Sequence, residues 1–284
     1  MKGRASFGWL LLSPGFLWLV ALVAAPLVLM IFYSLSVKLA PGTPWPQGFT
    51  LAQYRRLIDV LYLRIFLRSI AQAGAATVLS LALGYPLAYY IARLPKGKRE
   101  RLLLLVIIPF WTNFLVRTYA WMVLLRAQGV INSLLLYVGL IREPLPLLYN
   151  EWAVQLGLVY TMLPLMILPL YSNLEKLDQR LLDAAHDLGA SPAAAFWQVT
   201  WPLSRPGVFM GGLLVFISAF GMFIVPDLMG GSRTVMIGNL IQNQFLGARN
   251  WPFGAAAALA LTVVVLVLAL GAERAARLNG GVKP

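Results

Sequence analysis

Hydrophobic residues run along this chain in six long stretches that short polar segments separate. A helix needs roughly 20 residues, at ~1.5 Å each, to cross the apolar part of a bilayer, and every stretch reaches that length. The pattern therefore predicts an all-α, polytopic membrane protein with six transmembrane helices. The predicted spans lie near residues 10–35, 69–92, 102–125, 152–172, 204–229 and 252–272.

Residues 51–66, between the first two spans, carry an apolar stripe at helical spacing. The stripe contains Leu51, Tyr54, Ile58, Leu61, Tyr62 and Ile65. We expect this segment to lie along the outer membrane interface or against a helix of a partner. Pro41, Pro44 and Pro46, just before it, predict an extended connector.

The basic residues of the short connections predict the orientation. Six spans place the two ends, the 93–101 loop and the 173–203 loop on one face, with 13 of the 23 Lys and Arg residues. Five of the nine residues from Arg93 to Arg101 are basic, and such short loops count most. We therefore expect this face, with both termini, to be cytoplasmic.

Composition supports the membrane class and narrows the chemistry. The chain is 60% hydrophobic with a mean hydropathy of +0.77, which is too apolar for a soluble domain of 284 residues. The excess of Lys and Arg that is usual in cytoplasmic loops of membrane proteins accounts for about half of the net charge of +13, so we do not expect a nucleic-acid partner. There is no cysteine, and His186 is the only histidine, so no metal site or cofactor is expected. No Gly-x-x-x-x-Gly-Lys-Ser/Thr loop and no catalytic set occur, so we expect no enzyme activity, and any ATPase must be another chain.

A polar island of about thirty residues lies between the fourth and fifth spans. Its pattern predicts two short helices around a sharp turn. Asp178 is placed to cap the first helix, and Gly189 stands where a left-handed residue ends it. Ser191 and Pro192 then fit the N-cap and first position of a second helix.

The same island contains Asp183-Ala184-Ala185, then Gly189, and later Val199-Thr200-Trp201-Pro202. This spacing resembles the cytoplasmic coupling loop of ATP-binding-cassette (ABC) import permeases, whose pattern is Glu-Ala-Ala, three residues, Gly, nine residues, Ile-x-Leu-Pro. Asp183, Val199 and Trp201 replace the Glu, Ile and Leu. The resemblance implies that residues 178–202 dock on an ATPase, with Asp183, Ala184, Ala185, Gly189, Phe196 and Pro202 as the coupling residues. Of these, Asp183 would provide an acid for docking, Gly189 a turn and Phe196 an apolar knob.

Charged residues near membrane depth are candidates for a substrate path, since each costs roughly 2.5–3.5 kcal/mol at mid-bilayer. Asp227 follows Pro226 at the outer end of the fifth predicted span, and Arg117 lies in the third. A carboxylate near aromatic side chains such as Trp111 and Tyr119 suits an organic cation. The alternative is a structural ion pair of Asp227 with Arg117 or Arg233.

Three further segments sharpen the resemblance: Gly84-Tyr85-Pro86-Leu87-Ala88-Tyr89-Tyr90, Ile108 to Tyr119, and Asp227-Leu228-Met229-Gly230-Gly231 with Trp251-Pro252-Phe253-Gly254-Ala255. They resemble the first permease subunit of spermidine/putrescine importers, from about residue 10 to 275. The resemblance implies a type I ABC importer of the bacterial inner membrane. Its implied partners are membrane lipid, a second permease, two copies of an ATPase and an extracytoplasmic substrate-binding protein. The implied organisation is a first helix with the external segment over 1–67, a permease core over 68–275 and a cytoplasmic tail over 276–284.

Two other functions remain open at this stage. One is a permease of the same branch for another small organic solute. The other, from a different class, is an ion-coupled secondary transporter, which would require coupling carboxylates near the midplane and an internal inverted repeat. We find neither in the sequence.

Overall fold

The computed structural model describes the backbone of residues 3–37 and 48–279, and the side chains of 15–37, 48–232, 234–271 and 274. The connector prolines 41, 44 and 46, the side chain of Arg233 and residues 280–284 of the expected tail lie outside this set. Within it, regular structure is helical apart from one isolated antiparallel bridge between Ser36 and Phe49. The predicted all-α class is confirmed.

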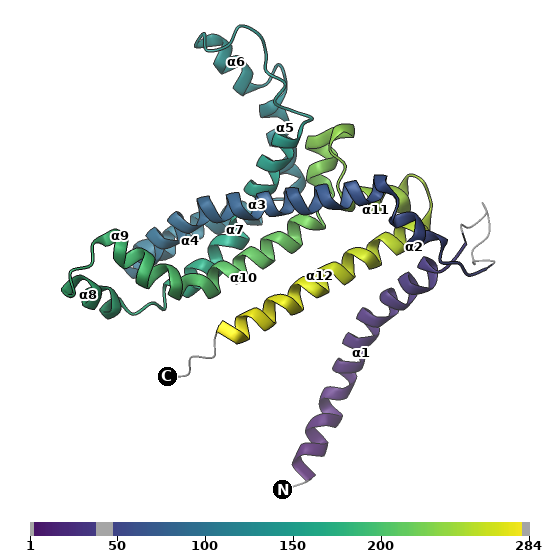
Figure 1. Ribbon diagram of the computed structural model, residues 1–284, viewed down its shortest axis with the longest axis horizontal. Helices are drawn as coiled ribbons and strands as arrows, with labels where there is room; N and C mark the ends of the chain where they lie inside the picture. The colour runs from purple at the N-terminus through teal and green to yellow at the C-terminus, as the bar shows by residue number, and fades with distance from the viewer. Residues whose placement is uncertain (1–2, 38–47, 280–284) are drawn as a thin grey trace. The chain divides into compact units, whose positions relative to one another are not determined.

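The helices follow one another with short connections (Figure 1). In chain order they are α1 (Gly3–Ser34), α2 (Ala52–Leu57), α3 (Val60–Ala92), α4 (Lys96–Trp111), α5 (Phe114–Leu125), α6 (Val130–Tyr137), α7 (Glu151–Leu174), α8 (Gln179–Asp187), α9 (Pro192–Ala195), the π-helical turn η1 (Phe196–Thr200), α10 (Trp201–Phe220), the π-helical turn η2 (Pro226–Gly230), the 3-10 turn η3 (Gly231–Arg233), α11 (Ile237–Leu246) and α12 (Trp251–Asn279).

Within the described residues, six helical segments are long and apolar enough to cross a membrane, which confirms the predicted number. They are Gly15–Ser34, Val60–Ala92, Phe114–Tyr137, Glu151–Leu174, Pro192–Phe220 and Trp251–Gly271. The fourth and sixth agree with the predicted limits within a few residues, whereas the second, third and fifth differ.

The third span was predicted at 102–125, but the helix breaks inside that range. Pro109 lies in the last turn of α4, and the Thr112 hydroxyl donates to its carbonyl at 2.6 Å. Asn113 then caps α5 by accepting from the Leu115 amide at 2.8 Å. Residues 102–125 were predicted as one helix because their hydrophobicity is continuous. In the structure, the third apolar segment long enough to span a membrane is Phe114–Tyr137 instead.

The fifth span was predicted at 204–229, but α10 ends at Phe220. Residues 221–223 are non-helical, and the Asn239 amide donates to the Phe223 carbonyl at 2.8 Å, which satisfies one freed backbone acceptor. The start of α11 comes so close that a Cβ on Gly238 would lie 2.7 Å from the Gly221 carbonyl oxygen. Asp227 therefore lies on the separate turn η2, beyond the span.

The external segment 51–66 also differs from the prediction. It is divided between α2 and α3, and α3 continues without interruption from Val60 into the second span. Of the apolar stripe, Leu51, Ile58 and Leu61 are exposed, whereas Tyr54, Tyr62 and Ile65 are half-buried.

The chain forms two compact units. The first takes in the described residues of 1–63 and 240–264, where the Tyr33 and Trp251 rings meet edge to face at 5.8 Å. In the same unit the Tyr62 ring lies 4.7 Å from that of Phe253. The second unit takes in the described residues of 64–239 and from 265 onward, and it contains the predicted coupling loop.

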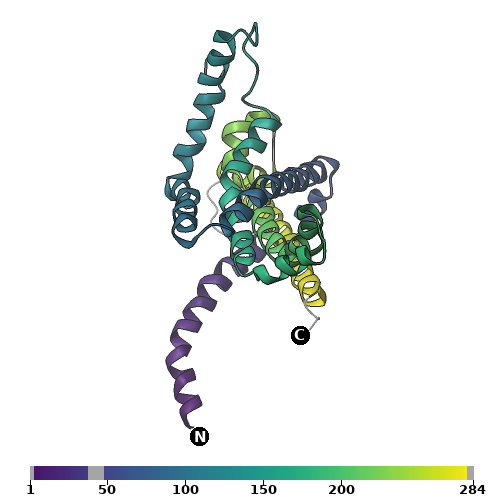
Figure 2. The same cartoon turned by 90° about the vertical axis from the view of Figure 1, so that its left-hand side faces the viewer.

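Helix α7 is the central helix of the second unit, with α10 packed along it (Figure 1). A Cβ on Gly207 would lie 2.7 Å from Cβ of Asn173, and one on Gly211 would lie 2.9 Å from the Met166 sulfur. Lipid tails are as apolar as leucine, so helices in a membrane gain little from apolar burial and depend on such close backbone approach. Figures 1 and 2 show α6 at the far end of an arm that α5 begins, away from α7 and α10.

Candidate functional site

Helix α8 opens the loop at 178–202 and is built as predicted. The Asp178 carboxylate accepts from the Arg180 amide at 3.0 Å, which satisfies one of the free amides of the first turn. Leu182 is the buried residue of the helix, at 7% exposure. Helix α8 contacts α9 and η1, so it lies against the second half of the loop.

Gly189 ends α8 with a φ of +85°. The Gly189 amide donates to the His186 carbonyl, and the Ala190 amide donates to the Ala185 carbonyl, each at 2.9 Å. These two bonds form a Schellman motif, in which the residue at Gly189 must be left-handed. The predicted conformation of Gly189 is confirmed.

Ser191 and Pro192 start the second helix of the loop as predicted. The Ser191 hydroxyl accepts from the Ala194 amide at 3.3 Å, and Pro192 takes the first helical position. The helix then continues through the π-helical turn η1 into α10, with Pro202 in the first turn of α10. Helix α9 is therefore continuous with α10, which forms the rest of the fifth span.

Phe196, the expected apolar knob, is half-buried, and its ring contacts two tyrosines of α3. It lies 5.8 Å from both Tyr85 and Tyr89, edge to face with each. The Tyr85 hydroxyl shares a buried hydrogen bond of 2.8 Å with Ser204. Phe196 therefore fastens the loop to α3.

Other side chains provide the outward surface of the loop. Leu188 is 89% exposed and Trp197 is 62% exposed, although both are large and apolar. Asp183 and Ala184 are exposed beside them on α8, and Ala185 is half-buried. Leu188 was not among the predicted coupling residues, although an apolar residue just before the helix-ending glycine is visible in the sequence.

Asp227, the candidate substrate contact, lies exposed on η2. The turn itself is anchored: Met229 is fully buried, and its carbonyl accepts from the Tyr149 amide at 2.9 Å. The expected alternative was an ion pair of Asp227 with Arg117 or Arg233. The pair with Arg117 does not occur among the described side chains, and the side chain of Arg233 lies outside them. Asp227 is thus a carboxylate that a buried neighbour holds in place.

Arg117 lies among aromatic rings. Its guanidinium carbon is 5.9 Å from the Phe110 ring centre and 6.0 Å from that of Tyr160. Trp111, at 76% exposure, and Tyr119, at 51%, make no ring contact within the described part of the chain. Helix α5, which carries Tyr119, packs against η2, which carries Asp227, and the role of these residues in a substrate path stays a prediction.

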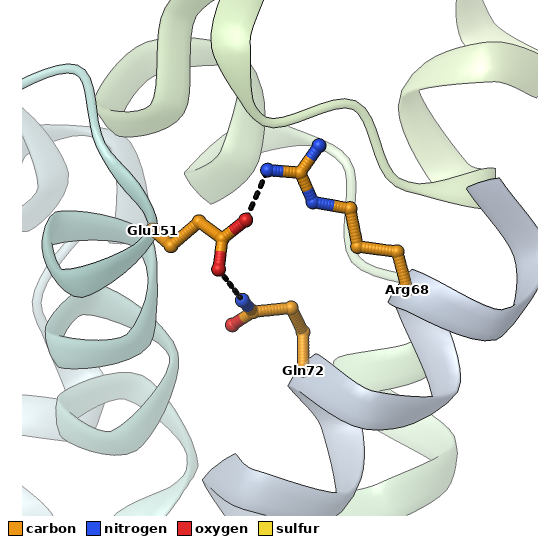
Figure 3. Close-up of polar contacts among 3 residues, drawn as sticks. All are labelled: Arg68, Gln72 and Glu151. Atoms are coloured by element: carbon orange, nitrogen blue, oxygen red, sulfur yellow. Dashed lines mark hydrogen bonds and ion pairs between the residues drawn. The ribbon is translucent and has the colours of Figure 1, made fainter. Parts of the chain in front are cut away.

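A polar contact that the sequence reading missed joins α3 to α7 (Figure 3). Arg68 forms an ion pair with Glu151, and the Gln72 amide donates to the same carboxylate at 3.3 Å. Arg68 and Gln72 lie one helical turn apart, so both face the first residue of α7. Glu151 also gains from its place at the positive end of the helix dipole.

A second ion pair fastens the other end of α7. Arg99 of α4 lies 3.1 Å from the carboxylate of Glu175, the residue that caps α7. Helix α7 is thus tied to α3 at its start and to α4 at its end. Among the described side chains, no group of three or more metal-ligating residues comes together.

Comparison with curated proteins gives relatives over almost the whole length. The chain is 45% identical to the spermidine/putrescine transport system permease protein PotB of Escherichia coli, over 92% of this chain and 94% of that protein. It is 41% identical to PotB of Haemophilus influenzae, over 93% of this chain and 92% of that one.

Solved structures give the same fold at low identity. A bacterial alginate ABC transporter in complex with an alginate pentasaccharide-bound periplasmic protein contains a chain with a TM-score of 0.77 and 17% identity, with 98% of this chain and 96% of that chain covered. The pattern of the family described as "Binding-protein-dependent transport system inner membrane component" matches residues 84–278, more than half of the chain. The chain belongs to this family of ABC importer permeases.

Proposed function

We propose that this chain is the permease subunit of an ATP-driven importer of spermidine and putrescine in the bacterial inner membrane. The observation that carries the proposal is 45% identity to a spermidine/putrescine permease over 92% of the chain. The capped two-helix loop with its exposed Leu188 supports the same function, because a permease without a nucleotide site needs a surface to receive force from an ATPase.

The proposed assembly contains a second permease, two copies of an ATPase and an extracytoplasmic substrate-binding protein. The loop at 178–202 contacts the ATPase, with Asp183, Leu188 and Trp197 on its open surface. The termini are cytoplasmic, which puts this loop on the ATPase side. The proposed core of the permease is 68–275, preceded by the first helix and external segment over 1–67.

The proposed mechanism is alternating access. Closure of the ATPase pair moves α8 and α9, and the unbroken helix through η1 carries the displacement into α10. Close contacts of α10 with α7 at Gly207 and Gly211 make the two helices move together. Phe196 keeps the moving loop attached to α3 through Tyr85 and Tyr89.

In this proposal, Asp227 contacts the cationic substrate at the outer side. Polyamines are flexible organic cations, so an exposed carboxylate on a rigid turn provides a charge-assisted contact. The buried Met229 holds η2 in place, which reduces the entropy lost when the substrate binds.

The test is uptake of labelled spermidine and putrescine by cells that lack their own polyamine importers. We expect uptake when the chain is expressed with its ATPase, second permease and binding protein, and none when the ATPase carries a Walker A substitution. Uptake of a different organic solute, with neither polyamine transported, would keep the importer class and reject the substrate.

A further inference from the structure

A cavity of about 260 Å³ lies inside the second unit, among the ends of α3, α4 and α7, the start of α8 and η1. Its lining includes Tyr89, Arg93, Arg99, Glu175, Gln179 and Thr200. Pockets for drug-sized molecules measure about 300–1,000 Å³, so this cavity fits one small group. The proposed function leaves this cavity unused.

The charges in the lining favour an anion. Arg93 and Arg99 bring two positive charges, and Glu175 brings one negative charge that is already paired with Arg99 at 3.1 Å. The Arg93 guanidinium stacks over the Tyr89 ring at 4.0 Å and has no acidic partner among the described side chains. The stacking fixes the plane of this guanidinium while its N–H groups stay available.

The side chain of Thr200 independently suggests that a hydrogen-bond acceptor binds here. The residue lines the cavity but is only 1% exposed, and its Oγ1 is buried without a hydrogen-bond partner among the described residues. A buried hydroxyl without a partner costs free energy that a bound acceptor would recover. Gln179 adds an amide donor to the same wall.

We propose that this cavity binds a phosphate group, either from an anionic lipid headgroup or from free phosphate. Guanidinium forks match the oxygen geometry of phosphate, and a tetrahedral group offers enough acceptors for Arg93, Thr200 and Gln179 together. Basic pockets between helices at the cytoplasmic side of a membrane bind lipid headgroups by the same chemistry. This inference rests on the proposed function for its cytoplasmic location.

The bound phosphate connects the moving loop to the rest of the unit. Thr200 and Gln179 belong to η1 and α8, whereas Arg93 lies in the connection between α3 and α4 and Arg99 lies in the first turn of α4. A ligand shifts a conformational equilibrium only if it binds one state better, and the shape of this cavity changes when α8 moves. Phosphate occupancy therefore favours the arrangement of the coupling loop seen here.

The experiment uses the assembled complex, stripped of lipid in detergent, and measures bound phosphatidylglycerol by native mass spectrometry during titration. A second arm titrates inorganic phosphate, and a third repeats the lipid titration with zwitterionic phosphatidylcholine. We expect Arg93→Gln to weaken binding about ten-fold, as for loss of one charge-assisted contact. Arg93→Lys keeps the charge but loses the fork, and we expect a smaller loss. Thr200→Val removes the buried hydroxyl at nearly constant volume and should also weaken binding.

The matched control is Lys98→Gln, because Lys98 is an exposed cation in the first turn of α4, next to Arg99, and does not line the cavity. Phosphatidylglycerol binding that inorganic phosphate does not displace assigns a lipid, and saturable binding of inorganic phosphate assigns the free anion. Equal binding by the wild type, Arg93→Gln and Lys98→Gln variants, or no binding in any arm, overturns the proposal. Polyamine uptake by the same complex is measured in parallel, so that failure of the proposed function is seen separately.

Discussion

Gly189→Val tests whether the turn of the loop couples this permease to its ATPase. The φ of +85° at Gly189 is a conformation that costs an L-residue about 1–2 kcal/mol, and more for a β-branched one. Helix α8 has nine residues and one buried side chain, Leu182, so its own stability is of the same order as this strain. A loss of about 1–2 kcal/mol changes the ratio of formed to open turns roughly 5–30-fold.

The assay is ATP hydrolysis by the assembled complex in lipid, with and without substrate-loaded binding protein. We expect Gly189→Val to insert and assemble normally and to lose about five-fold or more of the stimulated rate. Gly189→Asn should restore much of the stimulation, because asparagine tolerates the left-handed conformation.

Gly139 offers a matched control. It has a φ of +75°, no atom lies within 4 Å of a Cβ built there, and it ends α6 with the same pair of backbone bonds, to Leu135 and Leu136. Gly139→Val therefore introduces the same strain on the opposite side of the membrane. Unchanged stimulation in Gly189→Val at normal assembly, or an equal loss in Gly139→Val, would refute the reasoning.

Three further predictions concern the two sides of the subunit. Asp227→Asn should lower spermidine uptake at limiting substrate about ten-fold. The control Glu143→Gln changes an exposed acid without an assigned role and should not lower uptake. Equal uptake by both variants would show that Asp227 is not part of the substrate path. Glu151→Gln should lower the free energy of unfolding by about 1 kcal/mol or less, because the ion pair between Glu151 and Arg68 of α3 is half-exposed. A loss of several kcal/mol would contradict this. Leu188→Ser should weaken binding of the ATPase in pull-down while Leu140→Ser, at a similarly exposed leucine, does not; retention of the ATPase by both would remove Leu188 from the contact.

Local signals in the sequence predicted the coupling loop well. Asp178, Gly189, Ser191 and Pro192 each act within a few residues of their own position, so their effect on the backbone is readable without the fold. The number of spans was also predictable, because length and hydrophobicity decide it.

The helix limits and contacts that were not predicted depend on interactions that a hydrophobicity pattern does not contain. The break at Asn113 depends on one capping hydrogen bond, and the early end of α10 depends on α11 approaching Gly221. The pairing of Arg68 with Glu151 joins residues 83 positions apart, and no local pattern announces it. The contact of the Phe196 ring with Tyr85 and Tyr89 likewise has no local signal, because the two tyrosines lie on another helix.

The most direct test of the central claim is uptake of labelled spermidine into proteoliposomes that contain the complete complex, with binding protein outside and ATP inside. We expect accumulation of spermidine that requires ATP and the ATPase subunit, and none in vesicles that contain this chain alone under a proton or sodium gradient. Gradient-driven uptake by the chain alone would contradict the account and would indicate a secondary transporter.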